Sequence, residues 1–96
     1  MTLGKKIKEL RESKEILQRQ LAASLEIDTP MFSKIERGDR RAKREQVVQL
    51  ATLLKADLNE LLTLWLADQV IEIIKGEEVA KRVMQQVEKQ LDTEKR

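Results

Sequence analysis

The segment from Gln18 to Gly38 constrains the fold of this chain more than any other. Its apolar residues recur within two short stretches at helical spacing, so each stretch can form a helix with one buried face. A tight turn at residues 26–28 separates the stretches, and a glycine follows the second. The pattern therefore predicts two short helices packed across a turn. The residues expected to face inward are Leu21, Leu25, Ile27, Phe32 and Ile35.

The composition favours an all-α domain. With one Phe, one Trp and no Tyr, the chain has few of the aromatic residues that sheets use, so its core must be aliphatic. Its 96 residues suffice for one modest core, to which a partner subunit would add useful stability. We see no internal repeat and no linker rich in Pro, Gly or Ser, so a second independent domain is not expected.

Several function classes are disfavoured by the residues present. The chain has no cysteine and no histidine, which removes disulfides, thiolate metal sites and the commonest catalytic base. Its 17 carboxylates alternate with lysines and arginines on the expected helix surfaces, and there is no glycine-rich phosphate loop. We expect no enzyme activity, no metal and no cofactor. No apolar run is long enough to span a bilayer, so we expect a cytoplasmic protein without a membrane partner.

Further helices are expected on both sides of the central pair. Thr2 and Asp28 are placed to cap the first and third helices, and Pro30 falls in the first turn of the third. Gly38 is the natural left-handed stop after the third helix. The first five helices are expected at residues 3–14, 18–25, 29–37, 43–55 and from about 57 onward.

The last third of the chain has more apolar surface than one helix face needs. Residues 61–74 are apolar on nearly every side, and Lys75-Gly76 resembles a helix end. A final helix is expected at residues 77–91, followed by a charged tail at 92–96 that should fray. We expect this region to form a homodimer, and Trp65 to serve in core or interface packing. The expected interface residues are Trp65, Val70, Ile74, Val79, Val83 and Val87.

The net charge of +2 conceals an asymmetry between the two halves of the chain. Residues 1–44 carry 12 Lys and Arg against 7 Asp and Glu, a net +5, whereas residues 45–96 carry 7 against 10, a net −3. The basic half contains the two-helix segment, and its densest basic run is Arg40 to Arg44. Such a run is often only a solvated loop, but here it adjoins the second helix of the pair. A polyanion would therefore approach this half first.

These residues carry a family resemblance. Leu10-Arg11, Gln18 and Leu21-Ala22 precede the run Ser33 to Gly38 (SKIERG) at a characteristic spacing, and Leu50-Ala51 and Leu61-Leu62 follow. Over about its first 62 residues, the chain resembles the Cro/phage-repressor-type helix-turn-helix proteins, also called the xenobiotic-response-element family. The resemblance implies a five-helix lambda-repressor-like DNA-binding domain at residues 1–65. The apolar pattern of the last third adds the expectation of a C-terminal helical extension at residues 66–96 for dimerisation.

The same resemblance implies site residues for double-stranded DNA. The third helix would enter the major groove. The residues implied to contact bases are Thr29, Pro30, Ser33 and Lys34. The residues implied to contact phosphates are Gln18, Arg19, Met31, Arg37, Arg40, Arg41 and Lys43.

The chain departs from the family pattern at three positions. Leu17 replaces the usual Ser or Thr cap of the second helix, so another group must cap it. Glu26 replaces the turn glycine, which requires either a left-handed non-glycine residue or a different turn. Pro30 can offer only methylene contact, for example to a thymine methyl.

Two neighbouring charges need separate interpretations. Glu36 is interpreted as structural and paired with a nearby arginine, because an acid facing phosphates would weaken binding. Arg37 is open to two interpretations, ion pairing near Glu36 or phosphate contact.

The sequence therefore predicts a transcriptional regulator. We expect a homodimeric repressor that binds an inverted-repeat operator. The alternative is a protein-interaction module, an antitoxin or adaptor whose C-terminal helices bind a partner protein.

Overall fold

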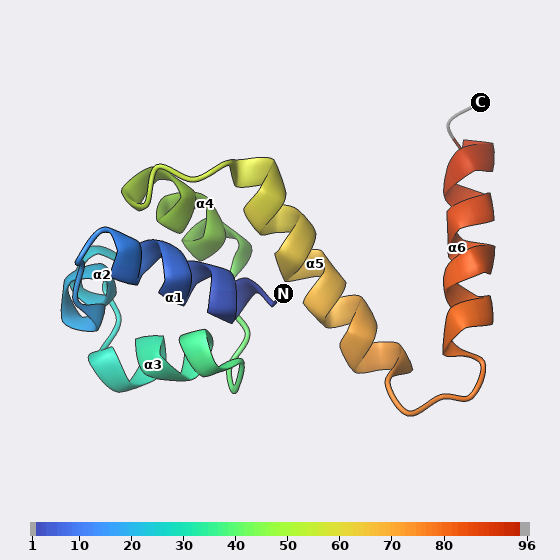
Figure 1. Cartoon of the computed structure of the whole chain (residues 1–96), viewed down its shortest axis with the longest axis horizontal. Helices are drawn as coiled ribbons and strands as arrows, with labels where there is room; N and C mark the ends of the chain where they lie inside the picture. Colours follow the sequence, from blue (N-terminus) through green and yellow to red (C-terminus); the bar gives the residue numbers. More distant parts are fainter. Residues whose placement is uncertain (1, 95–96) are drawn as a thin grey trace.

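The computed structural model describes residues 2–94 and is helical throughout, with no strand in that range. Five helices form a body, and a sixth stands apart from it (Figure 1). The predicted all-α class is therefore confirmed. The helices are α1 (Leu3–Ser13), α2 (Gln18–Ser24), α3 (Thr29–Arg37), α4 (Arg44–Leu53), α5 (Leu58–Ile74) and α6 (Ala80–Glu94).

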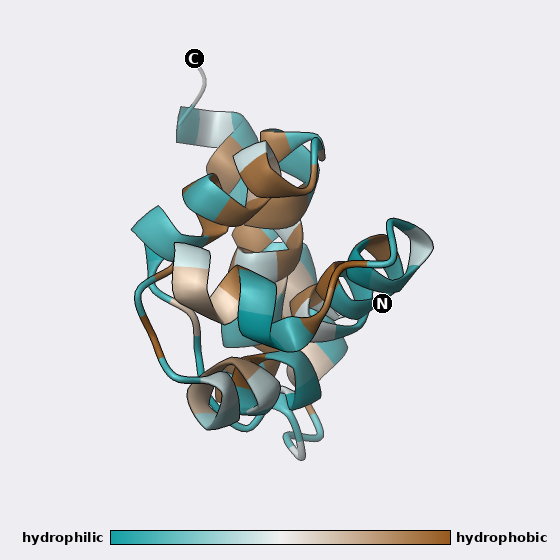
Figure 2. Cartoon of the chain, turned by 90° about the vertical axis from the view of Figure 1, so that its left-hand side faces the viewer, coloured by the Kyte–Doolittle hydropathy of each residue, from teal (hydrophilic) through white to brown (hydrophobic). Residues whose placement is uncertain are grey.

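The core lies where α1 to α5 meet, and it is aliphatic apart from one phenylalanine. Phe32 of α3 is fully buried, together with Ile7 of α1 and Leu61 of α5. The five residues predicted to face inward from α2 and α3 all belong to this core or pack on it. Figure 2 shows hydrophobic residues on several helices of the body. The helical spacing of apolar residues thus positions α3 with one face buried and the opposite face free.

The helix ends follow the capping predictions. Thr2 accepts a hydrogen bond from the Lys5 N–H at 3.2 Å, and Asp28 accepts one from the Met31 N–H at 2.7 Å. Gly38 ends α3 with φ +83°, in the left-handed region that favours glycine. Glu26 takes φ +60°, so the turn before α3 uses a left-handed non-glycine residue.

The start of α2 uses a substitute for the missing cap. Leu17 cannot cap through its side chain, but its N–H donates to the Gln20 side chain at 2.8 Å. One of the exposed donors at this helix end is therefore satisfied from inside the helix.

The C-terminal region confirms one predicted helix end and departs from two other predicted bounds. The helix α5 runs without a break through residues 65 and 66 to Ile74, and Gly76 follows with φ +82°, so the helix end predicted at Lys75-Gly76 is confirmed. The last helix begins at Ala80 rather than at Glu77, because residues 75–79 form a turn. It also continues past Leu91 to Glu94, so residues 92–94 of the tail expected to fray are helical, and residues 95 and 96 lie outside the described range.

Candidate nucleic-acid interface

The outer face of α3 carries the residues predicted to contact bases. Pro30 and Lys34 are exposed, while Thr29 and Ser33 are half-buried. The opposite face is anchored by Phe32 and the other buried residues of α3. Because residues three and four apart share a helix face, these four residues lie together on one face of the first two turns of α3, with Pro30 as the one apolar member.

A buried ion pair holds α3 against α1. The Arg11 Nε donates to Glu36 Oε2 at 2.7 Å, and its Nη2 donates to Oε1 at 3.2 Å. The Arg11 Nη1 also donates to the backbone carbonyl of Ile16 at 2.9 Å. The hydrogen bond with Glu36 raises the pKa of Arg11 and outweighs the lowering by burial, so the guanidinium stays charged at all physiological pH values. The predicted structural role of Glu36 is thus accounted for by Arg11.

Gln18 joins this ion pair at the first turn of α2. Its Nε2 donates to Glu36 Oε1 at 2.9 Å, so one of its two amide donors is used inside the protein. The pairing orients the Gln18 side chain between α2 and α3. Backbone N–H groups at the start of α2 lie beside it, and such groups favour an anion.

Arg37 forms its ion pair with Asp39 rather than with Glu36. Its Nε donates to Asp39 Oδ2 at 3.1 Å, and its Nη1 donates to Ser33 Oγ at 3.0 Å. Both charged groups of the Arg37–Asp39 pair are more than half exposed, so the pair is weak and can open. Ser33 accepts from Arg37 and keeps its own hydroxyl proton free to donate.

The loop at residues 38–43, which follows α3, exposes basic side chains to solvent and is held to the body by a buried residue. Arg40, Arg41 and Lys43 are exposed, whereas Ala42 between them is buried. The Trp65 indole Nε1 of α5 donates to the Ala42 carbonyl at 2.8 Å. This contact joins the predicted phosphate loop to α5, and the sequence offered no signal for it because the two residues are 23 positions apart.

Two more contacts place Trp65 and α5 against the body. The Arg44 guanidinium carbon lies 5.8 Å from the centre of the Trp65 ring, within cation–π range. One turn further along α5, Asp68 Oδ2 accepts from the Leu3 N–H at 3.0 Å and so satisfies a donor at the start of α1. The half-buried Trp65 thus has partners within its own chain.

A groove joins these parts into one surface. Its lining includes Gln18 and Ser33 together with exposed cations from α1, α3 and the loop. Two of these cations, Lys5 and Lys8, were not among the predicted contact residues. Their spacing of three along α1 is the signal that places them on one face. The cations lining the groove are Lys5, Lys8, Arg37, Arg40 and Arg41, and the acids lining it are Glu36, Asp39, Asp68 and Glu72.

Two of the predicted phosphate contacts lie outside this lining. Arg19 is exposed on the first turn of α2, and Met31 is half-buried on the first turn of α3. Within residues 2–94, no three His, Cys, Asp or Glu side chains are grouped so that they could hold a metal ion. In the same range, no helix has the length and apolar character needed to cross a bilayer.

A match to a known family agrees with this helical fold. Residues 2–64 match the family described as a helix-turn-helix domain, which covers α1 to the middle of α5. The chain therefore belongs to the helix-turn-helix family, a DNA-binding class. Searches among curated proteins and among solved structures found no match.

Replacing Trp65 with phenylalanine tests the anchoring of the basic loop. The variant keeps an aromatic ring but leaves the Ala42 carbonyl without its donor, so we expect a loss of about 1–2 kcal/mol in the free energy of unfolding. Urea denaturation followed by helical circular dichroism measures this loss. In the control Arg44→Ala, only the stacking contact is removed, and a loss below about 1 kcal/mol is expected. Equal stability of Trp65→Phe and the wild type would show that the hydrogen bond contributes nothing.

Proposed function

We propose that this protein is a sequence-specific regulator of transcription that binds double-stranded DNA as a homodimer. The observation that supports this best is the outer face of α3, on which Lys34 is exposed, beside a groove lined by five cations and four acids. A helix of this diameter fits the major groove, and cations on its flank fit the phosphates of the adjacent backbone. A dimer bound at a promoter would occlude it, so we infer a repressor acting at an inverted-repeat operator.

The base contacts proposed here belong to the N-terminal half of α3. Lys34 is exposed and can donate to guanine O6 and N7. Ser33 and Thr29 offer hydroxyl groups that can donate or accept, and Pro30 offers apolar contact to a thymine methyl.

The phosphate contacts proposed here surround α3. Gln18 and Arg19 lie at the start of α2, Met31 lies on the first turn of α3, and Arg37 becomes available when its exposed pair with Asp39 opens. The loop residues Arg40, Arg41 and Lys43 complete the set.

Replacing Lys34 with alanine tests direct base recognition. If Lys34 contacts a base, the variant should lose about 1–3 kcal/mol of affinity for the preferred site and little for random duplex DNA. Arg41→Ala is the comparison variant. Losing a phosphate contact should weaken binding to both duplexes equally and reduce the slope of log affinity against log salt concentration by about one. Titration of both duplexes at several salt concentrations measures these effects. An equal loss on both duplexes for Lys34→Ala would assign Lys34 to the phosphates.

Selection of bound sites from random duplex DNA tests the function as a whole. Enrichment of an inverted repeat is the expected result, since two reading heads related by two-fold symmetry bind symmetric half-sites. No enrichment would contradict the proposal. That outcome would favour the second candidate, an antitoxin or adaptor that binds a partner protein through the exposed apolar side chains of α5 and α6.

A further inference from the structure

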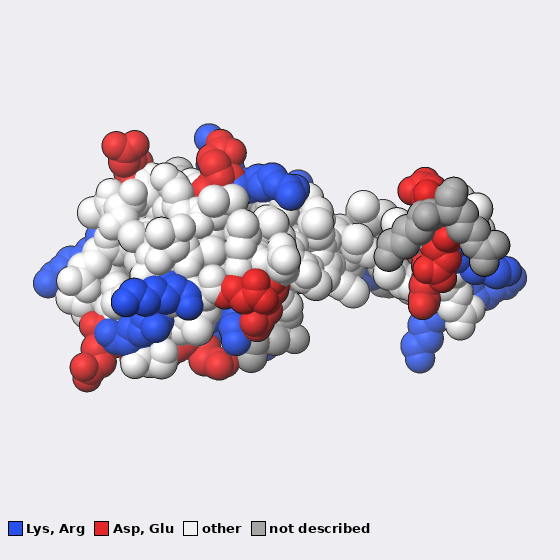
Figure 3. Space-filling model, turned by 90° about the horizontal axis from the view of Figure 1, so that it is seen from above, with Lys and Arg blue, Asp and Glu red and all other residues white. Residues whose placement is uncertain are grey.

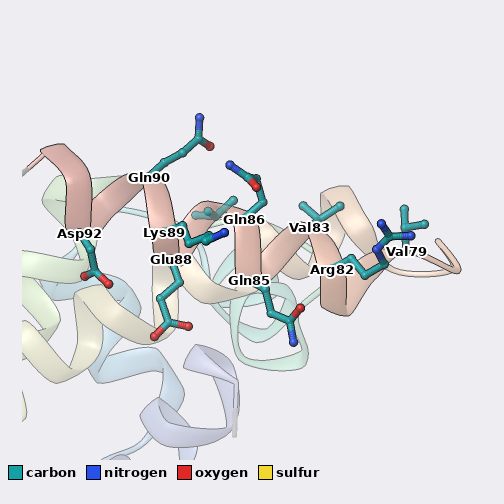
Figure 4. A pocket seen from close by; sticks show the side chains of 10 residues that line it. Val79, Arg82, Val83, Gln85, Gln86, Glu88, Lys89, Gln90 and Asp92 are labelled. Carbon is teal, nitrogen blue, oxygen red and sulfur yellow. The ribbon is translucent and has the colours of Figure 1, made fainter.

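The helix α6 presents an apolar stripe that is exposed to solvent. Val83, Met84, Val87 and Leu91 are between 36% and 54% exposed, and α6 has no buried residue. Figure 4 shows α6 from close by, with Val83 on one edge and Glu88 on the other. A helix with one apolar stripe normally buries it against a partner helix.

The spacing of this stripe is that of a helix–helix seam. Ala80, Met84, Val87 and Leu91 are separated by four, three and four residues, which is the heptad pattern of paired helices. In an antiparallel pair of identical helices, the first residue of the seam meets the last residue of the other copy. Ala80 then faces Leu91 of the second copy, and Met84 faces Val87 of the second copy.

The charges beside the seam select this antiparallel orientation. Lys81 and Glu88 are both exposed and share one edge of the seam, because each follows an inner heptad position by one residue. In the antiparallel pair, Lys81 of each copy faces Glu88 of the other, which gives two attractive pairs. In a parallel pair, the same two positions face Gly76 and Val83, and no attractive pair forms.

The other edge of the seam carries Val83 and Gln90 and is uncharged, so an apolar surface can pack against it. The outer half of α5 provides such a surface, because Leu66, Val70 and Ile73 are exposed, Ile73 to 78%. On the face drawn in Figure 3, the stretch between the body and α6 shows few charged side chains, whereas Glu72 and Lys75 of the same stretch form an exposed ion pair. A stable interface needs about 20–30 residues from each partner, more than the seam face of α6 supplies alone, so the exposed apolar residues of α5 must contribute as well.

We propose that α6 pairs antiparallel with α6 of a second copy of this chain, with Lys81 facing Glu88 across the pair and the apolar side chains of α5 closing the uncharged edge. The inference rests on the homodimer of the proposed function and specifies its geometry. Such an interface is two-fold symmetric, so it gives the two α3 helices the symmetry of an inverted repeat.

Charge exchange in the full-length chain tests this pairing. Lys81→Glu and Glu88→Lys each turn both attractive pairs into repulsive ones, so each variant alone should dimerise on the order of tenfold more weakly at low salt. Mixing the two variants one to one restores attraction in every pair, and the double variant restores it within one species. Analytical ultracentrifugation at tens of micromolar without DNA measures these association constants.

The control variants are Arg82→Glu and Lys89→Glu, which change charge on the side of α6 away from the seam and should leave dimerisation unchanged. A monomeric wild type, or single variants that dimerise as the wild type does, would overturn the proposal. Failure of the mixture to recover would also overturn it. Because no DNA is present, the result is independent of DNA binding, which is measured separately on a duplex with one half-site.

Discussion

Replacing Glu36 with alanine is expected to lower the free energy of unfolding by about 3–5 kcal/mol, the usual cost of removing one partner from a buried ion pair. The Glu36 side chain is 2% exposed and the Arg11 side chain 10%, so the cation left behind has little access to water. Gln18 loses its acceptor in the same variant. Thermal or urea denaturation at fixed protein concentration measures the loss, which for a domain of this size corresponds to a fall of 10 °C or more, at about 4–8 °C per kcal/mol.

The matched control is Asp39→Ala, which removes the acid from the exposed pair with Arg37 and should change stability by less than about 1 kcal/mol. A second comparison replaces both buried partners, as Arg11→Met with Glu36→Leu. This double variant should be more stable than Glu36→Ala, because no charge remains buried without a partner. Equal losses for Glu36→Ala and Asp39→Ala would show that burial does not strengthen the Arg11–Glu36 pair.

Replacing Gly4 with alanine is expected to destabilise the protein by about 3 kcal/mol, although the same change within an exposed helix usually stabilises by about 1 kcal/mol. A Cβ atom at Gly4 would lie 2.2 Å from the Glu36 carbonyl oxygen and 2.9 Å from that of Ile35. Both atoms belong to the backbone of α3, so α1 and α3 must separate to admit the methyl group. The effect falls at the upper end of the range for an overfilled core.

Gly38→Ala separates this steric effect from backbone strain. Nothing lies within 4 Å of a Cβ at Gly38, and only its φ of +83° opposes the change, at about 1–2 kcal/mol. Urea denaturation of both variants should therefore show the larger loss for Gly4→Ala. A stabilised Gly4→Ala would mean that α1 and α3 do not approach this closely in solution.

Local features of the fold were predictable from residues close together in the chain. Asp28 caps α3 and Gly38 ends it. Glu26, which stands where the family has a turn glycine, takes the left-handed conformation. Each of these outcomes depends on hydrogen bonds or sterics within one turn of helix. The start of the last helix was placed at Glu77 because paired acids favour a helix N-terminus, but the turn at residues 75–79 delays it to Ala80.

The candidate site was only partly predictable. The sequence placed Lys34 and Pro30 on the outer face of α3, since Phe32 and Ile35 mark the inner one. Nothing in the sequence indicated that Lys5 and Lys8 line the same groove as Gln18, because this depends on the angle at which α1 crosses the pair α2–α3.

The sequence by itself determined most of the helix positions and their buried faces, since helical periodicity and capping act over three or four residues. Only the tertiary structure decided which side chains from distant segments meet. It paired Glu36 with Arg11, 25 residues away, and tied the loop at Ala42 to Trp65. The physical reason is that such contacts depend on how whole helices pack, and periodicity within one helix says nothing about which neighbour it packs against.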